Sequence, residues 1–324
     1  MKDSLPAFSA GKESFTAFRA WLAGHRDNVS VVADDGRAHL AHHAAVPRVL
    51  ASTVKVVHLL AYTTAVTGGG LDPAEPVRVG DWDAFHPFDG DGPIGAGAHH
   101  RALTTLGIAC DEHGVARDPE QRVPLDAIAT AMISESDNAA PDYLRARLGD
   151  EAVRAAAADG AWPDADLRWF CGETLRSLFP GEGDLTAHFT RDPAFRREVF
   201  ERVRGEPLSG EAEWDWTQRT AHGTAEQLFA FHRHLATADT PAVALARRKL
   251  GRGVLYKGGS LPRTRALGLS TSGGTVAMFF TGTDFPEVPL AELGLAVLAD
   301  LPGFARDLGV RVGPGWATID PCEY

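Results

Sequence analysis

The segment VLASTVKVVHLLAY, at residues 49–62, is an apolar run that contains one serine and one lysine. Its hydrophobic residues surround most of a helical circumference, which predicts a helix buried on nearly all sides. Ser52 and Lys55 are three positions apart and therefore share one face of that helix. A buried lysine must be paired or lose its charge, because burial disfavours the ammonium form. Any fold of this chain must therefore provide either a partner or a use for the amine of Lys55.

A neutral amine at Lys55 would be a base beside the hydroxyl of Ser52, which is the arrangement that nucleophilic catalysis requires. Burial and the positive end of the helix both favour the neutral form, and the free N–H groups of the helix start can face a developing oxyanion. Only five of the 32 basic residues are lysines, and lysine, unlike arginine, can be deprotonated. The alternative is structural: Lys55 pairs with a carboxylate or extends to solvent.

The composition excludes several classes of protein. The 324 residues are 44% hydrophobic, enough for a large core in one large domain or two closely packed ones. A net charge of -11 with scattered arginines argues against nucleic-acid binding. No segment has the length of a membrane span, and the N-terminal residues lack the apolar core of a secretory signal, so we expect a cytoplasmic protein with no membrane partner. Cys110, Cys171 and Cys322 lack metal-ligand spacing and are expected to be reduced packing residues.

Strand patterns occur at both ends of the chain, with helical patterns between them. Residues 15–22 have apolar side chains at helical spacing, and NVSVVADDGRAHLAHH predicts a hairpin with its turn at Asp35–Gly36. Later, GVLYKGGS, RALGLSTS and TVAMFFTG predict strands, the last two joined at Gly273–Gly274, and a helical segment follows around Leu290–Leu308. The predicted fold class is α/β, with one antiparallel sheet built from both chain ends, residues 1–46 and 220–324, flanked by terminal helices, and an all-helical lobe at 47–219 that carries Ser52.

Two further short motifs stand where they could reach the serine and the lysine. Ser136-Asp137-Asn138 lies on a short, exposed connection between two predicted helices, Leu125–Ile133 and a second one that has Pro141 in its first turn. Its alternative interpretation is an ordinary helix N-cap. Lys257 is expected at the end of a strand, followed by Gly258 and Gly259, which let another backbone or a ligand approach closely. The alternative is that Lys257-Gly258-Gly259 is only the end of a strand followed by a turn.

In this order and setting, Ser52-x-x-Lys55, Ser136-Asp137-Asn138 and Lys257-Gly258-Gly259 resemble the three signature elements of the penicillin-recognising serine enzymes, which include class A β-lactamases and penicillin-binding proteins. The resemblance also covers the β-lactamase-like layout of a helix-flanked sheet and a helical lobe. It implies Ser52 as the acylated nucleophile, Lys55 as its base and Ser136 as a proton relay. It further implies that Asn138 holds a substrate carbonyl, that Lys257 supports Ser136 and a substrate carboxylate, and that the N–H groups of Ser52 and Ser260, next to Gly259, form the oxyanion hole.

The chain also departs from that family. Gly258 stands where the family usually has a hydroxyl residue that helps to bind a substrate carboxylate, and Arg263 or Arg265 could supply that binding instead; the alternative is that both are surface arginines. Glu173 falls at a suitable distance for the glutamate that activates the deacylating water, but the accompanying asparagine is absent, so a surface or capping role is the alternative. The spacing between the first two motifs is also long, and the Gly- and His-rich residues 83–103 could rim the cleft or act as a lid.

Other cofactor and metal sites are not expected. Gly90, Gly92 and Gly95 match a dinucleotide fingerprint only formally, since no strand leads into them and Pro93 interrupts them. Loop residues His86, His99, His100, Asp89 and Asp91 have no metal-ligand spacing. We therefore expect a serine hydrolase without a cofactor that acts through an acyl-enzyme on a small ester, amide or lactam, with or without a carboxylate on the substrate. A biosynthetic acyltransferase on the same scaffold and a non-catalytic ligand-binding protein are the alternatives, and the sequence leaves the oligomeric state open.

Overall fold

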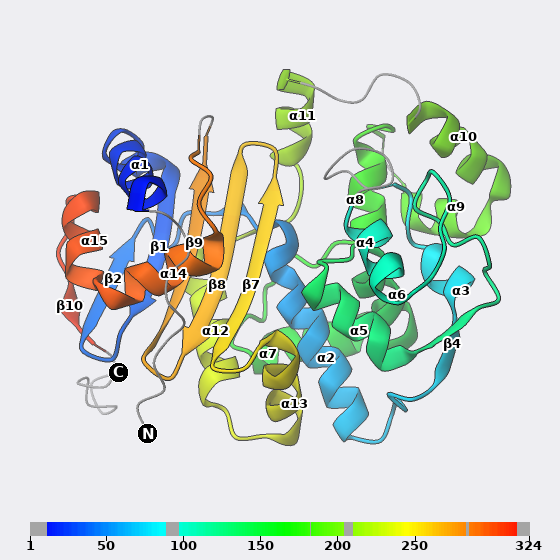
Figure 1. Cartoon of the computed structure of the whole chain (residues 1–324), viewed down its shortest axis with the longest axis horizontal. Coiled ribbons are helices and arrows are strands. Elements are labelled where there is room, and N and C mark those ends of the chain that lie inside the picture. Colours follow the sequence, from blue (N-terminus) through cyan, green and yellow to red (C-terminus); the bar gives the residue numbers. More distant parts are fainter. Residues whose placement is uncertain (1–11, 89–96, 182, 204–209, 283–284, 316–324) are drawn as a thin grey trace.

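Strands from both ends of the chain pair into one six-stranded antiparallel sheet in the computed structural model, which describes residues 12–88, 97–181, 183–203, 210–282 and 285–315 (Figure 1). The strand order is β10-β2-β1-β9-β8-β7. The bounds are β1 Val29–Asp34, β2 Ala38–His42, β7 Val254–Leu261, β8 Thr264–Thr271, β9 Gly274–Thr281 and β10 Gly313–Pro314. The predicted α/β class, with a sheet built from both chain ends, is confirmed.

Three hairpins, β1–β2, β7–β8 and β8–β9, set the register of this sheet. The β1–β2 turn lies at the predicted Asp35–Gly36, where Gly36 adopts a φ of 80° and the Asp35 carboxylate accepts hydrogen bonds from the backbone N–H groups of Arg37 and Ala38. The β8–β9 hairpin turns immediately before Gly274. Lys257 was predicted at a strand end but lies in the middle of β7, because Gly258 and Gly259 continue the ladder opposite Leu267 and Ala266.

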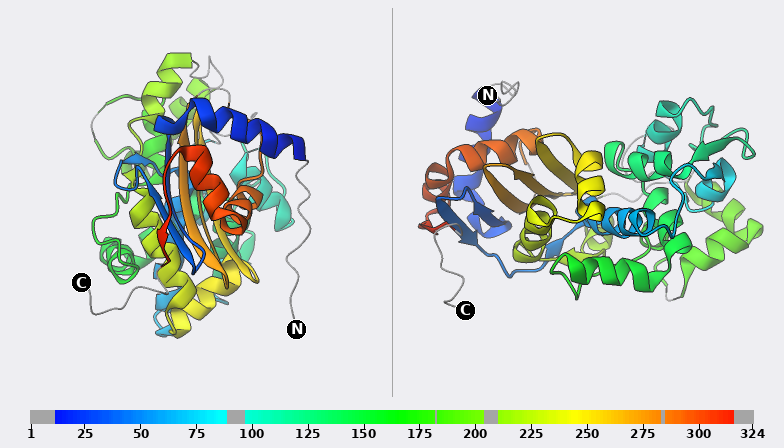
Figure 2. Two further views of the ribbon diagram at one scale, coloured as in Figure 1. Left: turned by 90° about the vertical axis from the view of Figure 1, so that its left-hand side faces the viewer. Right: turned by 90° about the horizontal axis from the view of Figure 1, so that it is seen from below.

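Helices cover both faces of the sheet (Figure 2). Alternate residues of β9 face opposite sides, so Met278 and Phe280 pack with α1 (Lys12–Gly24), α14 (Leu290–Ala299) and α15 (Leu301–Leu308), whereas Ala277 and Phe279 face the core shared with α12 (Ala225–Thr237). The helical segment predicted around Leu290–Leu308 is two helices, because the chain bends at Asp300, whose carboxylate accepts a hydrogen bond from the N–H of Gly303.

The middle of the chain is mainly helical and lies beside the β7 edge of the sheet (Figure 1). The short strand β3 (Arg48–Val49) and the 3₁₀ turn η2 (Ala51–Val54) lead into helix α2 (Lys55–Thr67), which packs against α5, α6, α7 and α13. The other helices are α3 Val79–Asp83, α4 Ala98–Thr105, α5 Leu125–Ser134, α6 Ala139–Leu148, α7 Asp150–Asp159, α8 Phe170–Arg176, α9 Leu185–Arg191, α10 Pro193–Val203, α11 Gly210–Thr217 and α13 Pro241–Leu250. Two-residue and three-residue strands pair as β3 with β6 (His222–Gly223) and β4 (Pro76–Arg78) with β5 (Arg122–Pro124).

Two smaller expectations concern cysteines and membranes. Cys110 and Cys171 are free thiols, and Cys171 is buried, whereas Cys322 lies outside the described residues. Among the helices within the described ranges, none has both the length and the apolar character needed to cross a bilayer.

The contact between β8 and α12 gives a stability prediction. A Cβ at Gly268 would lie 2.2 Å from the buried ring of His232, so the Gly268→Ala variant must displace that ring or the strand. We expect it to lower the free energy of unfolding by about 1–3 kcal/mol, as overpacked cores do. Gly24→Ala is the control, because nothing lies within 4 Å of its Cβ. Urea denaturation of the two variants compares them, and equal stabilities would contradict the packing described here.

Candidate active site

Ser52 lies in the turn that precedes helix α2, directly against the edge strand β7. The expected helix over 49–62 begins at η2, and Ser52 precedes its first α-helical residue by three positions. Ala51, just before it, has a φ of 47°, a conformation that L-residues rarely adopt. A Cβ at Gly259 would lie 2.7 Å from the backbone N of Ser52 and 3.0 Å from the Cβ of Ala51. The glycine in β7 therefore allows the turn that holds Ser52 to approach the strand.

The amine of Lys55 lies at the centre of the site and is fully buried. Its Nζ is 3.0 Å from the Oγ of Ser52, 2.5 Å from the backbone carbonyl oxygen of Ser136 and 2.6 Å from the Oδ1 of Asn138. The two carbonyl-type oxygens can only accept hydrogen bonds. A neutral amine has two N–H groups for these two acceptors and one lone pair, which then faces the hydroxyl of Ser52. The geometry therefore matches a base that can take the Ser52 proton.

The connection between α5 and α6 supplies the partners of Lys55. Ser136 has a φ of 62°, a left-handed conformation that costs a non-glycine residue about 1–3 kcal/mol. This conformation directs the Ser136 carbonyl at Lys55, and Asn138 is the N-cap residue that precedes α6. The connection was predicted to be exposed, but the side chain of Asp137 is completely buried. It is buried because its two oxygens accept hydrogen bonds from groups inside the helical lobe.

Lys257 reaches the same site from the sheet. Its Nζ donates hydrogen bonds to the Oγ of Ser136, at 2.9 Å, and to the carbonyl of Gly258, at 2.8 Å. Burial, together with the nearby charge of Lys55, holds the pKa of Lys257 well below its ordinary value. The three sequence motifs, which are up to 205 residues apart in the chain, therefore meet through direct contacts among Ser52, Lys55, Ser136 and Lys257.

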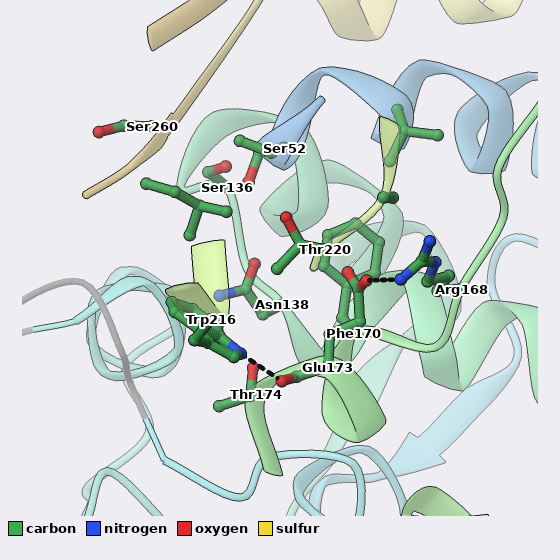
Figure 3. Close-up of a pocket in the computed structure, with 14 residues that line it drawn as sticks. Ser52, Ser136, Asn138, Arg168, Phe170, Glu173, Thr174, Trp216, Thr220 and Ser260 are labelled. Carbon is green, nitrogen blue, oxygen red and sulfur yellow. Dashed lines mark hydrogen bonds and ion pairs between the residues drawn. The ribbon is translucent and has the colours of Figure 1, made fainter. Parts of the chain in front are cut away.

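A cavity of about 70 Å³ opens beside Ser52 (Figure 3). Ser136, Asn138 and Ser260 line it together with Ser52, and its other walls are largely apolar or aromatic. The remaining lining residues are Ala51, Val54, Arg168, Phe170, Glu173, Thr174, Trp216, Thr220, Ala221 and Leu261. The hydroxyls of Ser52 and Ser136 and the amide of Asn138 thus face a space that fits a small acyl group.

Glu173, on α8, lines this cavity but has no hydrogen bond to its buried Oε1. The Nη1 of Arg168 lies 3.7 Å from that oxygen, which is ion-pair distance but too long for a hydrogen bond. Burial raises the pKa of Glu173 to about 8, and the charge of Arg168 only partly opposes this effect. At neutral pH the carboxyl group is therefore mostly protonated and is a weak acceptor of a water proton.

The side chain that faces Lys55 from α8 is aromatic. The Nζ of Lys55 lies 4.9 Å from the ring centroid of Phe170. The N–H groups of Phe170 and Cys171 donate to the two carboxylate oxygens of Asp142, at 2.9 and 2.7 Å, which fixes the start of α8. Sequence reasoning missed both Phe170 and Asp142, although the aromatic pair Trp169–Phe170 just before Glu173 was a visible signal.

Arg263 and Arg265 lie away from this cavity. Arg265 donates from Nη1 to the carbonyl oxygens of Leu261 and Thr264, and the Nη1 of Arg263 is 3.2 Å from the Oε1 of Glu211. Both arginines line a different cavity, next to Phe280 and Phe285. Gly259 and Ser260, in contrast, lie at the Ser52 site.

The histidine-rich stretch 83–103 is described in part. Asp89, Asp91 and the three glycines of the formal nucleotide fingerprint, Gly90, Gly92 and Gly95, lie outside the described residues. His99 is on α4, completely buried between two carboxylates, and its ring stacks on that of His86 with centroids 4.2 Å apart. In the described part of the chain, no group of three or more histidine, cysteine, aspartate or glutamate side chains is arranged to hold a metal ion.

Comparison with known proteins gives one family. A model of the beta-lactamase enzyme family matches residues 14–237. The fold is similar to a beta-lactamase from Sphaerobacter thermophilus (TM-score 0.52, 16% identity, covering 91% of this chain and 97% of that one) and to a beta-lactamase from Streptosporangium roseum (0.52, 13%, 92% and 99%). It is also similar to PBP-A (0.51, 14%, 91% and 96%). No curated protein matches the sequence.

The buried carboxyl of Glu173 gives a pH-dependent prediction. Because its pKa is about 8 in the folded protein and 4.5 ordinarily, the folded state binds an extra proton between these pH values. Wild-type stability should therefore fall relative to Glu173→Gln as the pH rises from about 4.5 to 8, by at most about 1.4 kcal/mol per pH unit, and the difference should level off above pH 8. Thermal unfolding from pH 4 to 9 measures this difference. The exposed Glu151→Gln variant is the control, and a pH-independent difference would contradict the burial of Glu173.

Proposed function

The chain belongs to the beta-lactamase enzyme family, and from that premise we propose that it is a serine hydrolase that acts through an acyl-enzyme at Ser52 on a small ester, amide or lactam. The observation that carries the proposal is the position of Lys55. Its Nζ is 3.0 Å from the Ser52 hydroxyl, and two carbonyl-type oxygens occupy its other hydrogen-bonding positions. In its neutral form, a buried amine so placed is a general base for serine.

The chemistry follows from these contacts. Lys55 takes the Ser52 proton as Oγ forms a bond to the substrate carbonyl carbon, and the backbone N–H groups of Ser52 and Ser260 stabilise the oxyanion. As the bond to the leaving group breaks, Ser136 delivers a proton to that group and regains one from Lys55 or Lys257, both within 3.4 Å of its Oγ. Water then cleaves the acyl–Ser52 ester, releasing the acid and restoring the Ser52 hydroxyl.

The cavity supports a small acyl group. Its volume of about 70 Å³ accommodates only a few heavy atoms beyond the reacting carbonyl. Phe170 and Trp216 provide apolar walls, and Asn138 provides an amide that can bind a carbonyl. Since Arg263 and Arg265 lie elsewhere, Lys257 is the cation closest to Ser136 for a substrate carboxylate. We therefore favour a small ester or amide that does not depend on a carboxylate for binding.

Covalent labelling tests this proposal. A fluorophosphonate should add one adduct, detected by intact mass, to the wild-type protein and none to Ser52→Ala. Lys55→Arg should slow labelling by about 10²–10⁴-fold, because a guanidinium cannot accept the proton. Lys249→Arg is the matched control, because this lysine, in the last turn of α13, contacts Asp126 and Thr130 of α5 and does not line the Ser52 cavity. An adduct that persists in Ser52→Ala would contradict the role of Ser52, and no adduct in the wild type would favour a binding protein.

Two chromogenic substrates then separate esters from lactams. The wild-type protein should hydrolyse p-nitrophenyl acetate faster than nitrocefin, since the cavity is small and the one arginine among its described lining residues, Arg168, is paired with Asp166.

Acyl transfer to an amine or alcohol is a second candidate, and one observation favours it. The wall beside Lys55 on the α8 side is the ring of Phe170, and the Glu173 carboxyl is mostly protonated at neutral pH. Neither group is a good base for water. An acyl-enzyme in such a site would persist until a stronger nucleophile than water entered.

The ratio of transfer to hydrolysis tests this second function. With p-nitrophenyl acetate as donor and hydroxylamine as acceptor, the wild-type protein should form more acetohydroxamate than acetate. Phe170→Ala should shift the products toward acetate, because water can then occupy the space beside Lys55. Phe88→Ala is the control, because it removes a ring that packs outside this cavity, against buried apolar side chains of α8, α9 and α10. A product ratio that is unchanged in Phe170→Ala would contradict this function of the aromatic wall.

A further inference from the structure

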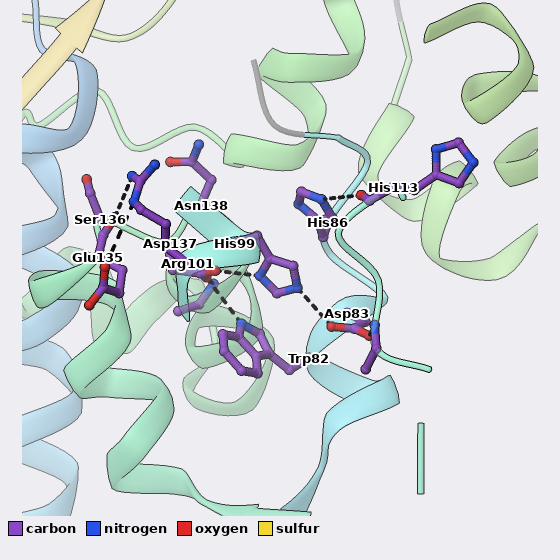
Figure 4. Close-up of polar contacts among 12 residues, drawn as sticks. Trp82, Asp83, His86, His99, Arg101, His113, Glu135, Ser136, Asp137 and Asn138 are labelled. Carbon is purple, nitrogen blue, oxygen red and sulfur yellow. Dashed lines mark hydrogen bonds and ion pairs between the residues drawn. The ribbon is translucent and has the colours of Figure 1, made fainter. Parts of the chain in front are cut away.

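His99 forms a buried ionic cluster directly beneath the second motif (Figure 4). Its Nδ1 lies 2.5 Å from the Oδ2 of Asp137, and its Nε2 lies 2.8 Å from the Oδ1 of Asp83. The side chains are 0–5% exposed, so water does not compete for these contacts. The rings of Trp82 and His99 form a T-shaped pair, with centroids 4.8 Å apart.

Both ring nitrogens of His99 face a carboxylate oxygen, which can only accept a hydrogen bond when ionised. The histidine therefore carries a proton on each nitrogen and is positively charged between two negative groups. Burial alone would oppose this charge, but the charges and hydrogen bonds of Asp137 and Asp83 outweigh it and raise the pKa of His99 to about 10. The same interaction keeps Asp137 ionised although it is buried, with its pKa below the ordinary value.

The remaining oxygens of the cluster bind it to two helices and to the segment between α4 and β5. The Oδ1 of Asp137 accepts hydrogen bonds from the Nε1 of Trp82, at 3.2 Å, and from the N–H of Ala140, at 2.5 Å. The Oδ2 of Asp83 accepts one from the N–H of Ala116, at 2.8 Å. Asp137 is thus held from α3, α4 and α6 at once.

The neighbours of Asp137 in sequence are the two residues that bind Lys55. Ser136 has its left-handed φ of 62°, and in this conformation its carbonyl is 2.5 Å from the Lys55 Nζ and its Oγ 2.9 Å from the Lys257 Nζ. Such a backbone persists only where the surroundings fix it. The Asp137 side chain is the anchored group between Ser136 and Asn138, and His99 supplies its charged partner.

We propose that His99 is a positioning residue for acylation: paired with Asp83, it holds Asp137 so that Ser136 and Asn138 bind Lys55 in the geometry that activates Ser52. His99 touches neither the substrate nor the reacting atoms. The proposal rests on the proposed function, because it assigns His99 a part in acylation at Ser52. It also assigns a role to the long segment between the first two motifs, because Asp83 and His99 both belong to that segment.

A paired substitution separates positioning from general stability. In His99→Gln the amide can donate to Asp137, but its oxygen then faces the Asp83 carboxylate, and the two repel. Adding Asp83→Asn supplies a donor to that oxygen, and the new amide can still accept from the N–H of Ala116. We expect His99→Gln to lower the fluorophosphonate labelling rate at saturating probe by up to about 100-fold, with little change in the probe concentration for half-saturation. The double variant should regain most of this rate.

His188→Gln, which removes an exposed histidine paired with one carboxylate, is the control and should label as the wild type does. A wild-type rate in His99→Gln, or a folded double variant that labels as slowly as His99→Gln, would overturn the proposal.

A second measurement keeps the test independent of labelling and of variant folding. In the wild-type protein with ¹⁵N-labelled histidine, NMR should show His99 with protons on both ring nitrogens and the Nδ1 proton shifted strongly downfield. A neutral ring at pH 7 would overturn the proposal. If the wild type shows no Ser52-dependent adduct, the proposed function fails, and with it the assignment of His99 to acylation. A doubly protonated His99 would in that case show only that the histidine fixes the α5–α6 connection.

Discussion

The buried amine of Lys55 is the interaction on which the rest of the site depends. A buried amine requires a partner for each of its hydrogen-bonding positions, and those partners come from η2 and from the α5–α6 connection. Phe170 of α8 covers it from a third side. Because these segments are distant in sequence, a single satisfied amine constrains the turn before α2, the start of α6 and the start of α8 together. Strand β7 of the sheet contacts the same site at two positions. Lys257 donates a hydrogen bond to Ser136, and Gly259 lies so close to Ser52 that a side chain there would displace the serine.

Sequence patterns were sufficient where the constraint is local. Alternating apolar residues and an Asp-Gly turn predicted the β1–β2 hairpin, and the apolar run around Lys55 predicted a buried helix. They were insufficient where a side chain can point in more than one direction. Arg263 and Arg265 closely follow Ser260 in the sequence, in the β7–β8 hairpin. Arg263 pairs with Glu211, and Arg265 donates to carbonyl oxygens of the hairpin, so the spacing in the sequence could not predict where either side chain points.

The groups that sequence reasoning missed depend on tertiary contacts. Asp142 and Phe170 are 28 residues apart in the sequence. Their importance arises only in the fold, where the Asp142 carboxylate accepts a hydrogen bond from the Phe170 N–H and so holds Phe170 beside Lys55. Asp83, His99 and Asp137 come from three segments, and the histidine was predicted to be a loop residue without metal-ligand spacing. Its position on a helix with each ring nitrogen facing a carboxylate depends on how the three segments pack, so the spacing of residues in the sequence could not predict it.

The buried charges of Asp83, His99 and Asp137 have a physical consequence for catalysis. A buried ion pair contributes little net stability, since desolvation offsets most of the attraction. The aspartate–histidine–aspartate cluster is therefore better explained by the conformation that it specifies than by the stability that it adds. That conformation includes a left-handed serine, which an uncharged hydrogen bond at the surface would not maintain against solvent competition. None of Asp83, His99 and Asp137 is among the described residues that line the cavity beside Ser52, so the charged cluster specifies this conformation while the space in front of the serine stays open for a substrate.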